Sequence, residues 1–124
     1  MDLQDVFFTA EDLISLGLSA CPGCAGELSL RTVMKIIGKN TVLGVPPGCM
    51  AGAGVVGWNR LAGAKVPITI PLLDNTASMM AGVRRYYQSI GRDDVKVIAF
   101  AGDGATADAG FQALSGAAER GENI

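Results

Sequence analysis

A short glycine-rich turn, Gly102-Asp103-Gly104, lies between an apolar segment and a run of small residues. A strand that ends in such a turn and leads into a helix offers free backbone N–H groups, which bind anions. The carboxylate of Asp103 would repel a phosphate unless a divalent cation lay between them, and Mg²⁺ accepts few carboxylates together with phosphate oxygens. The turn therefore predicts a magnesium-bound diphosphate, with Ala105 and Thr106 as further amide and hydroxyl donors.

Two other interpretations of this turn stay open. The segment from Gly102 to Ala107 also satisfies the loose G-x-G-x-x-A dinucleotide pattern, which would indicate a nicotinamide cofactor. That pattern needs an acidic residue about 20 positions later on a following strand, and the sequence ends before such a residue could be placed. A plain Gly-Asp-Gly turn without a ligand is the other alternative.

The cysteines form the second group of residues with chemical potential. The chain has three cysteines and no histidine: Cys21 and Cys24 flank Pro22-Gly23, and Cys49 follows Pro47-Gly48. Three thiolates without histidine suit an iron–sulfur cluster or zinc. Both sites normally take four protein ligands, so a fourth is expected from further sequence or another chain. A thioredoxin-like redox pair and buried, unreactive thiols are the alternatives.

Apolar periodicity, caps and chain breakers indicate the elements that must position these residues. Gly38 ends one predicted helix, Asp74 or Asn75 caps another, and the nearly all-apolar strand before Gly102 is expected to be central in a parallel sheet. The expected elements are a short helix or arm at 10–16, a helix at 27–37, a strand at 41–45, an edge or irregular segment at 66–72, a helix at 76–88 with Met79, Met80, Val83 and Tyr87 as its apolar stripe, a strand at 95–101 and a helix from about 107 to 120.

This order predicts an α/β fold with a doubly wound, mostly parallel sheet. Ligands in such sheets bind at the carboxyl ends of the strands, where Gly48, Cys49 and the Gly102-Asp103-Gly104 turn are expected to lie. We expect an N-terminal arm at 1–20 and the α/β domain at 21–124. Because a strand should follow Gly121, the domain is interpreted as incomplete in this sequence.

Composition narrows the class of protein. The chain is 49% hydrophobic and carries a net charge of -2, with a pI near 4.9 and no block of like charge, which argues against binding to nucleic acid or an anionic membrane. The acidic start lacks the features of a signal peptide, so a cytoplasmic location is expected. The apolar stretch 41–57 is broken by Pro46-Pro47-Gly48, which favours a buried segment over a membrane span.

Together the motifs resemble a known family. They are Cys21-Pro22-Gly23-Cys24, Pro47-Gly48-Cys49, Asp74-Asn75-Thr76-Ala77 and the run from Ala101 to Ala117. Over roughly residues 18 to 124 the sequence is similar to the β subunit of 2-oxoacid:ferredoxin oxidoreductases, pyruvate synthase in particular. The run Ala101 to Ala117 is the longest and most specific of these matches.

The resemblance implies a thiamine diphosphate-binding fold with a [4Fe–4S] cluster close to the cofactor. It implies that Asp103 is a Mg²⁺ ligand, that Gly102, Gly104 and Ala105 line the diphosphate, and that three irons are held by Cys21, Cys24 and Cys49. The fourth cysteine and the Asn-containing half of the thiamine motif lie downstream in the family, and the activating glutamate lies in another subunit or domain. No catalytic residue is therefore assigned in this chain.

The activity implied is oxidative decarboxylation of a 2-oxoacid, pyruvate first, with electrons passed through the cluster to ferredoxin. Expected partners are the other subunits of the oxidoreductase, ferredoxin and the 2-oxoacid. Coenzyme A is a further partner where it accepts the acyl group. The sequence departs from the family where Ala25-Gly26 follows the second cysteine and where residues 51–63 lack the more polar and aromatic stretch that the family resemblance leads one to expect. An oxalate-type relative without coenzyme A is thus an alternative. An electron-transfer or zinc-binding module without thiamine would explain the cysteines but leave Gly-Asp-Gly unexplained.

Overall fold

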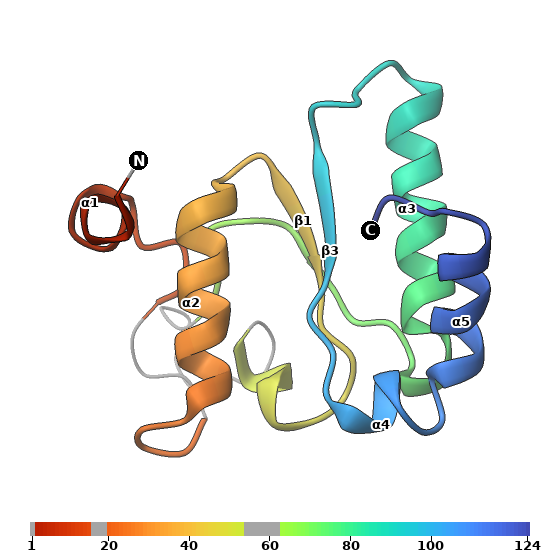
Figure 1. Ribbon diagram of the computed structural model, residues 1–124, viewed down its shortest axis with the longest axis horizontal. Coiled ribbons are helices and arrows are strands. Elements are labelled where there is room, and N and C mark those ends of the chain that lie inside the picture. Colours follow the sequence, from red (N-terminus) through yellow and green to blue (C-terminus); the bar gives the residue numbers. More distant parts are fainter. Residues whose placement is uncertain (1, 16–19, 54–62) are drawn as a thin grey trace.

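A parallel three-stranded sheet with helices on both faces organises the chain (Figure 1). The computed structural model describes residues 2–15, 20–53 and 63–124. The elements in chain order are α1 (Leu3–Thr9), α2 (Ala25–Ile37), β1 (Thr41–Gly44), the 3₁₀ helix η1 (Cys49–Ala53), β2 (Ile68–Thr69), the 3₁₀ helix η2 (Leu73–Asn75), α3 (Thr76–Ser89), β3 (Lys96–Ala99), α4 (Asp103–Thr106) and α5 (Phe111–Glu119).

The strand order is β2-β1-β3, and both pairings are parallel, with Leu43 opposite Ile68 on one side and Ile98 on the other. The α/β fold with a parallel sheet is therefore confirmed. The prediction that strand 95–101 is central was wrong within this sheet, because β1 is central and β3 pairs only with β1. A strand whose two faces are both covered by helices is apolar whether it lies at the edge or in the centre of the sheet. Its composition therefore shows that both faces are covered and does not show how many strands lie beside it.

Two clusters of buried side chains form the core, one on each face of the sheet. The cluster on the α2 face is built by Leu13, Ile14, Leu30, Met34, Leu43, Val45 and Val66. The cluster on the α3 face is built by Val42, Met80, Val95 and Val97. Helix α5 packs against α3, on the side away from α2 (Figure 1). Neighbouring residues of β1 thus belong to different clusters, as the alternation of side chains along a strand requires.

Most predicted elements are confirmed, with shifted ends. Helix α2 begins at Ala25, two positions before the predicted start, and ends at Gly38, whose φ of 86° is a left-handed conformation that glycine adopts without strain. The segment at 66–72 contributes the two-residue edge strand β2. Helix α3 starts after Asn75, although the Asn75 side chain makes no capping hydrogen bond. Of its predicted stripe, Met80 is buried while Met79 is 39% exposed.

The helix alternative for residues 10–16 was wrong for the part that the structure describes. The helix lies earlier, at Leu3–Thr9, where the Asp2 side chain accepts a hydrogen bond from the Gln4 amide. Residues 13–15 are extended instead: Ile14 pairs with Ala64 in an antiparallel bridge. Both Leu13 and Ile14 are buried in the α2-side core. Long-range pairing has overridden local helix preference here, and the predicted boundary between arm and domain stays a prediction.

The helix expected at about 107–120 is confirmed as α5 but begins later, at Phe111, and a separate short helix, α4, follows Gly102 where only a turn was expected. Gly110 lies in the turn between α4 and α5 and approaches the α4 backbone so closely that a Cβ on it would sit 2.0 Å from the Ala105 carbonyl oxygen. Its amide donates to the Gly104 carbonyl oxygen at 3.1 Å. The backbone therefore bends back on itself between the two helices.

The apolar stretch 41–57 was expected to be buried. Residues Thr41 to Pro46 are buried, but the expectation was wrong for Pro47, Gly48 and Cys49, which are exposed where the chain turns into the loop; residues 54–57 lie outside the described residues. Among the helices that the structure describes, none is long and apolar enough to cross a membrane.

Candidate functional site

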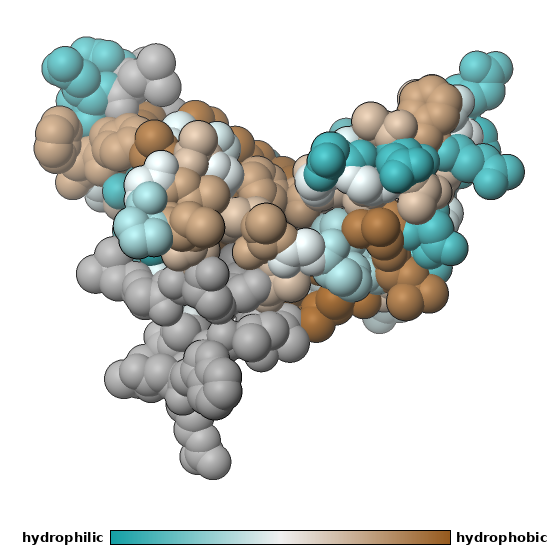
Figure 2. Space-filling view, turned by 90° about the horizontal axis from the view of Figure 1, so that it is seen from below, coloured by the Kyte–Doolittle hydropathy of each residue, from teal (hydrophilic) through white to brown (hydrophobic). Residues whose placement is uncertain are grey.

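The predicted cofactor residues meet in a cleft at the carboxyl ends of β1 and β3. The cleft has a volume of about 290 Å³, and its lining residues are Pro46, Pro47, Gly48, Cys49, Met50, Leu73, Phe100, Gly102, Asp103 and Gly104. Parallel pairing of β1 with β3 brings the two loops together, since Gly44 lies opposite Ala99 and both chains then leave the sheet at the same edge. Figure 2 looks onto this edge, where apolar and polar surface lie side by side.

The Gly102-Asp103-Gly104 turn is held by its own hydrogen bonds. The Thr106 hydroxyl donates to the Gly102 carbonyl at 2.9 Å and lies 3.3 Å from the Asp103 carbonyl. The Ala107 amide donates to the Asp103 carbonyl at 2.7 Å. The first amides of a helix have no partner within it, so those of Asp103 and Gly104 are available to a ligand. Asp103 itself is exposed.

The charge of the cleft favours a cation-bridged anion. Among the lining residues that the structure describes, Asp103 is the one with a carboxylate, and none is basic. A phosphate placed here would meet a carboxylate with no compensating side chain, whereas a Mg²⁺ ion would bind both. A diphosphate with Mg²⁺ therefore fits the chemistry of these residues.

Two of the predicted cofactor residues lie outside the cleft. Ala105 is 3% exposed. With Thr106 it lines a neighbouring hollow of about 230 Å³ between β3 and the α3 and α5 helices. The Thr106 hydroxyl has its proton directed at backbone carbonyls, so in this arrangement it shapes the turn and does not donate to a phosphate.

The cysteines lie on two loops that both come close to Gly26 in the first turn of α2. The Cys24 amide donates to the Cys21 carbonyl at 3.0 Å, which closes the Cys21–Cys24 loop just before α2. An ideal Cβ on Gly26 would lie 3.5 Å from Cys24 Sγ and 3.4 Å from Met50 Sδ, so the first turn of α2 contacts the loop that carries Cys49. All three are free thiols; Cys21 and Cys49 are exposed and Cys24 is half-buried.

The three sulfur atoms are not gathered into one centre. Across residues 2–15, 20–53 and 63–124, no three cysteine, aspartate or glutamate side chains lie close enough to hold a metal ion. Only Cys49 lines the cleft beside Asp103. The donor atoms suit a soft metal and their loops are adjacent, but the set is not pre-arranged.

Comparison with known proteins gives several relatives, although no family model matches the chain. It is 53% identical to the β subunit of NADH-dependent phenylglyoxylate dehydrogenase from Aromatoleum evansii, over 92% of this chain. It is 41% identical to the PorB subunit of pyruvate synthase from Methanothermobacter thermautotrophicus, over 92% of this chain. It is 34% identical to the VorB subunit of ketoisovalerate oxidoreductase from Pyrococcus furiosus, over 91% of this chain.

The chain belongs to the β subunits of 2-oxoacid:ferredoxin oxidoreductases. The resemblance to this family that the sequence motifs indicated is thereby confirmed. The chain spans 25% of the phenylglyoxylate dehydrogenase subunit and 39% of the PorB subunit, so it corresponds to well under half of these relatives.

For this β-subunit segment, sequence reasoning missed some of the cleft residues. Pro46, Met50, Leu73 and Phe100 line it. Pro46 and Phe100 each follow closely after a strand, and that position is the signal that could have indicated them. Leu73 gave no such signal; it reaches the cleft because η2 packs on α4, with the Leu73 side chain 3.4 Å from an ideal Cβ on Gly104. The Asn75 Oδ1 atom, also in η2, is buried without a hydrogen-bond partner.

Proposed function

We propose that this chain is the diphosphate-binding part of a 2-oxoacid oxidoreductase β subunit. The observation that carries the proposal is the cleft that the Gly48-Cys49 loop and the Gly102-Asp103-Gly104 turn line together, with Asp103 as the charged side chain among its described residues. The occupant we propose is thiamine diphosphate with Mg²⁺. When bound, thiamine diphosphate supplies the nucleophilic carbon that allows a 2-oxoacid to lose CO₂.

In this proposal the residues of the chain bind and orient the cofactor. Asp103 is the magnesium ligand, and the amides of Asp103 and Gly104 contact the diphosphate. Gly102 leaves the turn open on one side, since an added Cβ there would meet nothing within 4 Å. Ala105 and Thr106 hold the turn in shape from behind, which revises their role from direct donors to support.

We further propose that Cys21, Cys24 and Cys49 are three ligands of a [4Fe–4S] cluster. The contact of both cysteine loops around Gly26 supports this, as does the soft donor set without histidine. Cluster binding would have to draw the thiols together, because they are apart in the structure described. A fourth ligand comes from outside this chain.

The substrate class proposed is a 2-oxoacid, with the reaction completed by the other subunits of the complex in the cytoplasm. Pyruvate with ferredoxin as acceptor is the sequence-based prediction, and coenzyme A is the expected acyl acceptor. A second candidate is an aromatic 2-oxoacid with NAD as acceptor, favoured by the 53% identity to a subunit named NADH-dependent phenylglyoxylate dehydrogenase. Turnover of the assembled complex with pyruvate and phenylglyoxylate, each tested with ferredoxin and with NAD, distinguishes these candidates.

Replacing Asp103 tests the cofactor assignment. In the assembled complex, Asp103→Ala should abolish retention of thiamine diphosphate and Mg²⁺ while iron content stays close to the wild-type value, because the cysteines lie on other loops. Asp108→Ala is the matched control, since Asp108 is an exposed carboxylate that follows shortly after α4 and does not line the cleft. Thiamine diphosphate bound equally by all three proteins would refute the role of Asp103.

Metal analysis with a visible spectrum of the anaerobically purified complex tests the cluster. Iron with a broad absorption of the iron–sulfur type is the expected result. Zinc without iron would refute the cluster and would support instead a zinc-binding module at the cysteine loops.

A further inference from the structure

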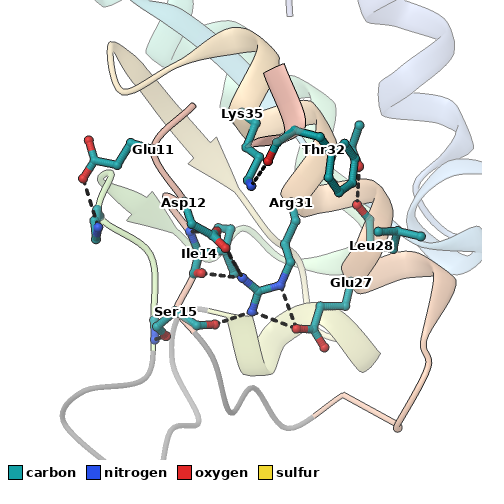
Figure 3. Close-up of polar contacts among 12 residues, drawn as sticks. Glu11, Asp12, Ile14, Ser15, Glu27, Leu28, Arg31, Thr32 and Lys35 are labelled. Carbon is teal, nitrogen blue, oxygen red and sulfur yellow. Dashed lines mark hydrogen bonds and ion pairs between the residues drawn. The ribbon is translucent and has the colours of Figure 1, made fainter. Parts of the chain in front are cut away.

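One half-buried arginine on α2 joins a segment that precedes the cysteine loop to the first turn of the helix that follows it (Figure 3). The Arg31 side chain is only 14% exposed. Its Nη1 atom donates to the Asp12 carboxylate at 3.1 Å and to the Ile14 carbonyl at 2.6 Å. Nη2 donates to the Ser15 carbonyl, and Nε donates to Glu27 at 2.9 Å. Every nitrogen of the guanidinium is therefore engaged.

These partners stand on opposite sides of Cys21–Cys24 in the sequence. Asp12, Ile14 and Ser15 belong to the extended segment that precedes the loop, whereas Glu27 is in the first turn of α2, three residues after Cys24. A single side chain thus joins residues 12–15, which precede the loop in the sequence, to the first turn of the helix that follows it.

The extended segment has an anchor of its own, independent of Arg31. Leu13 and Ile14 are buried in the α2-side core, and residues 13–15 are hydrogen-bonded to the strand-like segment at 63–65, with Lys65 N donating to Leu13 O and Ser15 N to Gly63 O, both at 2.8 Å. What Arg31 adds is the connection between this segment and the start of α2, next to the cysteines. That connection needs a guanidinium, whose planar fork of N–H groups reaches two neighbouring carbonyls and two carboxylates at once. The single ammonium group of a lysine cannot reach all four.

We propose that Arg31 is a positioning residue for the Cys21–Cys24 loop: by joining residues 12–15 to the start of α2, it limits how far the chain on either side of the loop can separate, so that both thiols can bind the same metal centre as Cys49. This role rests on the cluster assignment above. Groups that orient metal ligands without touching the metal typically change metal affinity by about 10- to 100-fold when they are lost.

The test uses Arg31→Lys in the assembled, anaerobically purified complex, with Arg84→Lys as the matched control. The Arg84 side chain is 8% exposed. Like Arg31, it donates to two backbone carbonyls, those of Asp93 and Val95, at 3.2 and 2.8 Å, but it lies on α3, and none of its contacts is to a cysteine loop. Both variants lose a buried or half-buried guanidinium, so both are expected to lower Tm.

The readouts are the rate of iron release to a chelator, measured well below both Tm values, and the thiamine diphosphate content. Arg31→Lys should release iron about tenfold faster than wild type, with its thiamine diphosphate content unchanged. Arg84→Lys should release iron at the wild-type rate. If Arg31→Lys does not assemble, Glu27→Gln weakens the same link and should accelerate release to a smaller degree.

Iron release from Arg31→Lys that equals wild type, or that rises equally in Arg84→Lys, would overturn the positioning role while leaving the cluster in place. A wild-type complex that contains no iron would overturn the cluster assignment and the role of Arg31 with it. The two failures are therefore distinguishable from one set of preparations.

Discussion

The Asp94 carboxylate joins two turns at the amino ends of the strands. It accepts hydrogen bonds from Arg92 at 2.9 and 3.1 Å and from the Asn40 amide at 2.7 Å. The hydrogen bond from Arg92, followed by that from Asn40, lowers the pKa of Asp94 from 3.8 to about 2. A carboxylate with a lowered pKa in the folded protein contributes stability above its unfolded pKa, and the contribution is lost as the pH falls through the folded value.

Asp94→Asn should therefore have a lower Tm than wild type from pH 5 to 7, and the difference should shrink as the pH falls from about 4 to about 2. Because the carboxylate is exposed to solvent, the difference should also decrease with added salt. Thermal unfolding followed by circular dichroism across this pH range measures it. A Tm difference that persists unchanged at pH 2 would mean that the charge is not what stabilises the two turns.

Candidate site residues could be picked out from the sequence where the residue type is unusual for its position in the chain. Asp103 stands out because a lone carboxylate in a glycine turn needs a cation, and the cysteines stand out because the chain has no histidine. The phosphate contact of Thr106 stays a prediction, since the structure shows its hydroxyl bonded to backbone carbonyls. Its hydroxyl can donate either to a phosphate or to a carbonyl one helical turn back, and the sequence does not distinguish the two.

At the scale of the helices, the close approach of α4 and α5 leaves no room for a side chain at Gly110. Gly110→Ala would place a Cβ within 2.0 Å of the Ala105 carbonyl oxygen, which is backbone and cannot rotate away. We expect the variant to lose about 1–3 kcal/mol of unfolding free energy. Gly82→Ala is the control, because Gly82 is an exposed position in α3 with open space at its Cβ.

Gly82→Ala should instead gain about 0.5–1 kcal/mol, since alanine restricts the unfolded chain more than glycine does. Urea denaturation of both variants provides the comparison. If Gly110→Ala were as stable as wild type, the close contact between α4 and α5 would not exist in solution.

Elements with strong local signals were predicted almost to the residue, and those decided by distant contacts were not. Helix α2 has an apolar period and a glycine stop, and both are local. The extended conformation at Ile14 depends on Ala64, 50 positions away, so local propensity gave the wrong element. The break between α4 and α5 depends on one backbone contact of Gly110, which no periodicity records.

At the scale of the whole molecule, we expect association at the outer edge of β3, which pairs with no further strand among the described residues. Lys96 N donates to Asn40 O and Phe100 N to Gly44 O, so these alternate residues face β1. Val97 and Ala99, which lie between them, direct their amides and carbonyls to the other side. Ile124 lies against this edge, and hollows of about 250 and 230 Å³ open beside it. Unpaired strand edges of this kind pair with further strands.

We expect the isolated chain to self-associate as its concentration rises, and Ala99→Pro to remain monomeric. Proline removes the outward amide at position 99 without disturbing the ladder with β1, and edge strands tolerate it for that reason. Ile98→Pro is the matched control: its amide faces β1, so that substitution should unfold the protein instead. Sedimentation velocity with circular dichroism separates the outcomes. Equal association of wild type and Ala99→Pro would place the contact elsewhere, on the exposed apolar side chains of the helices.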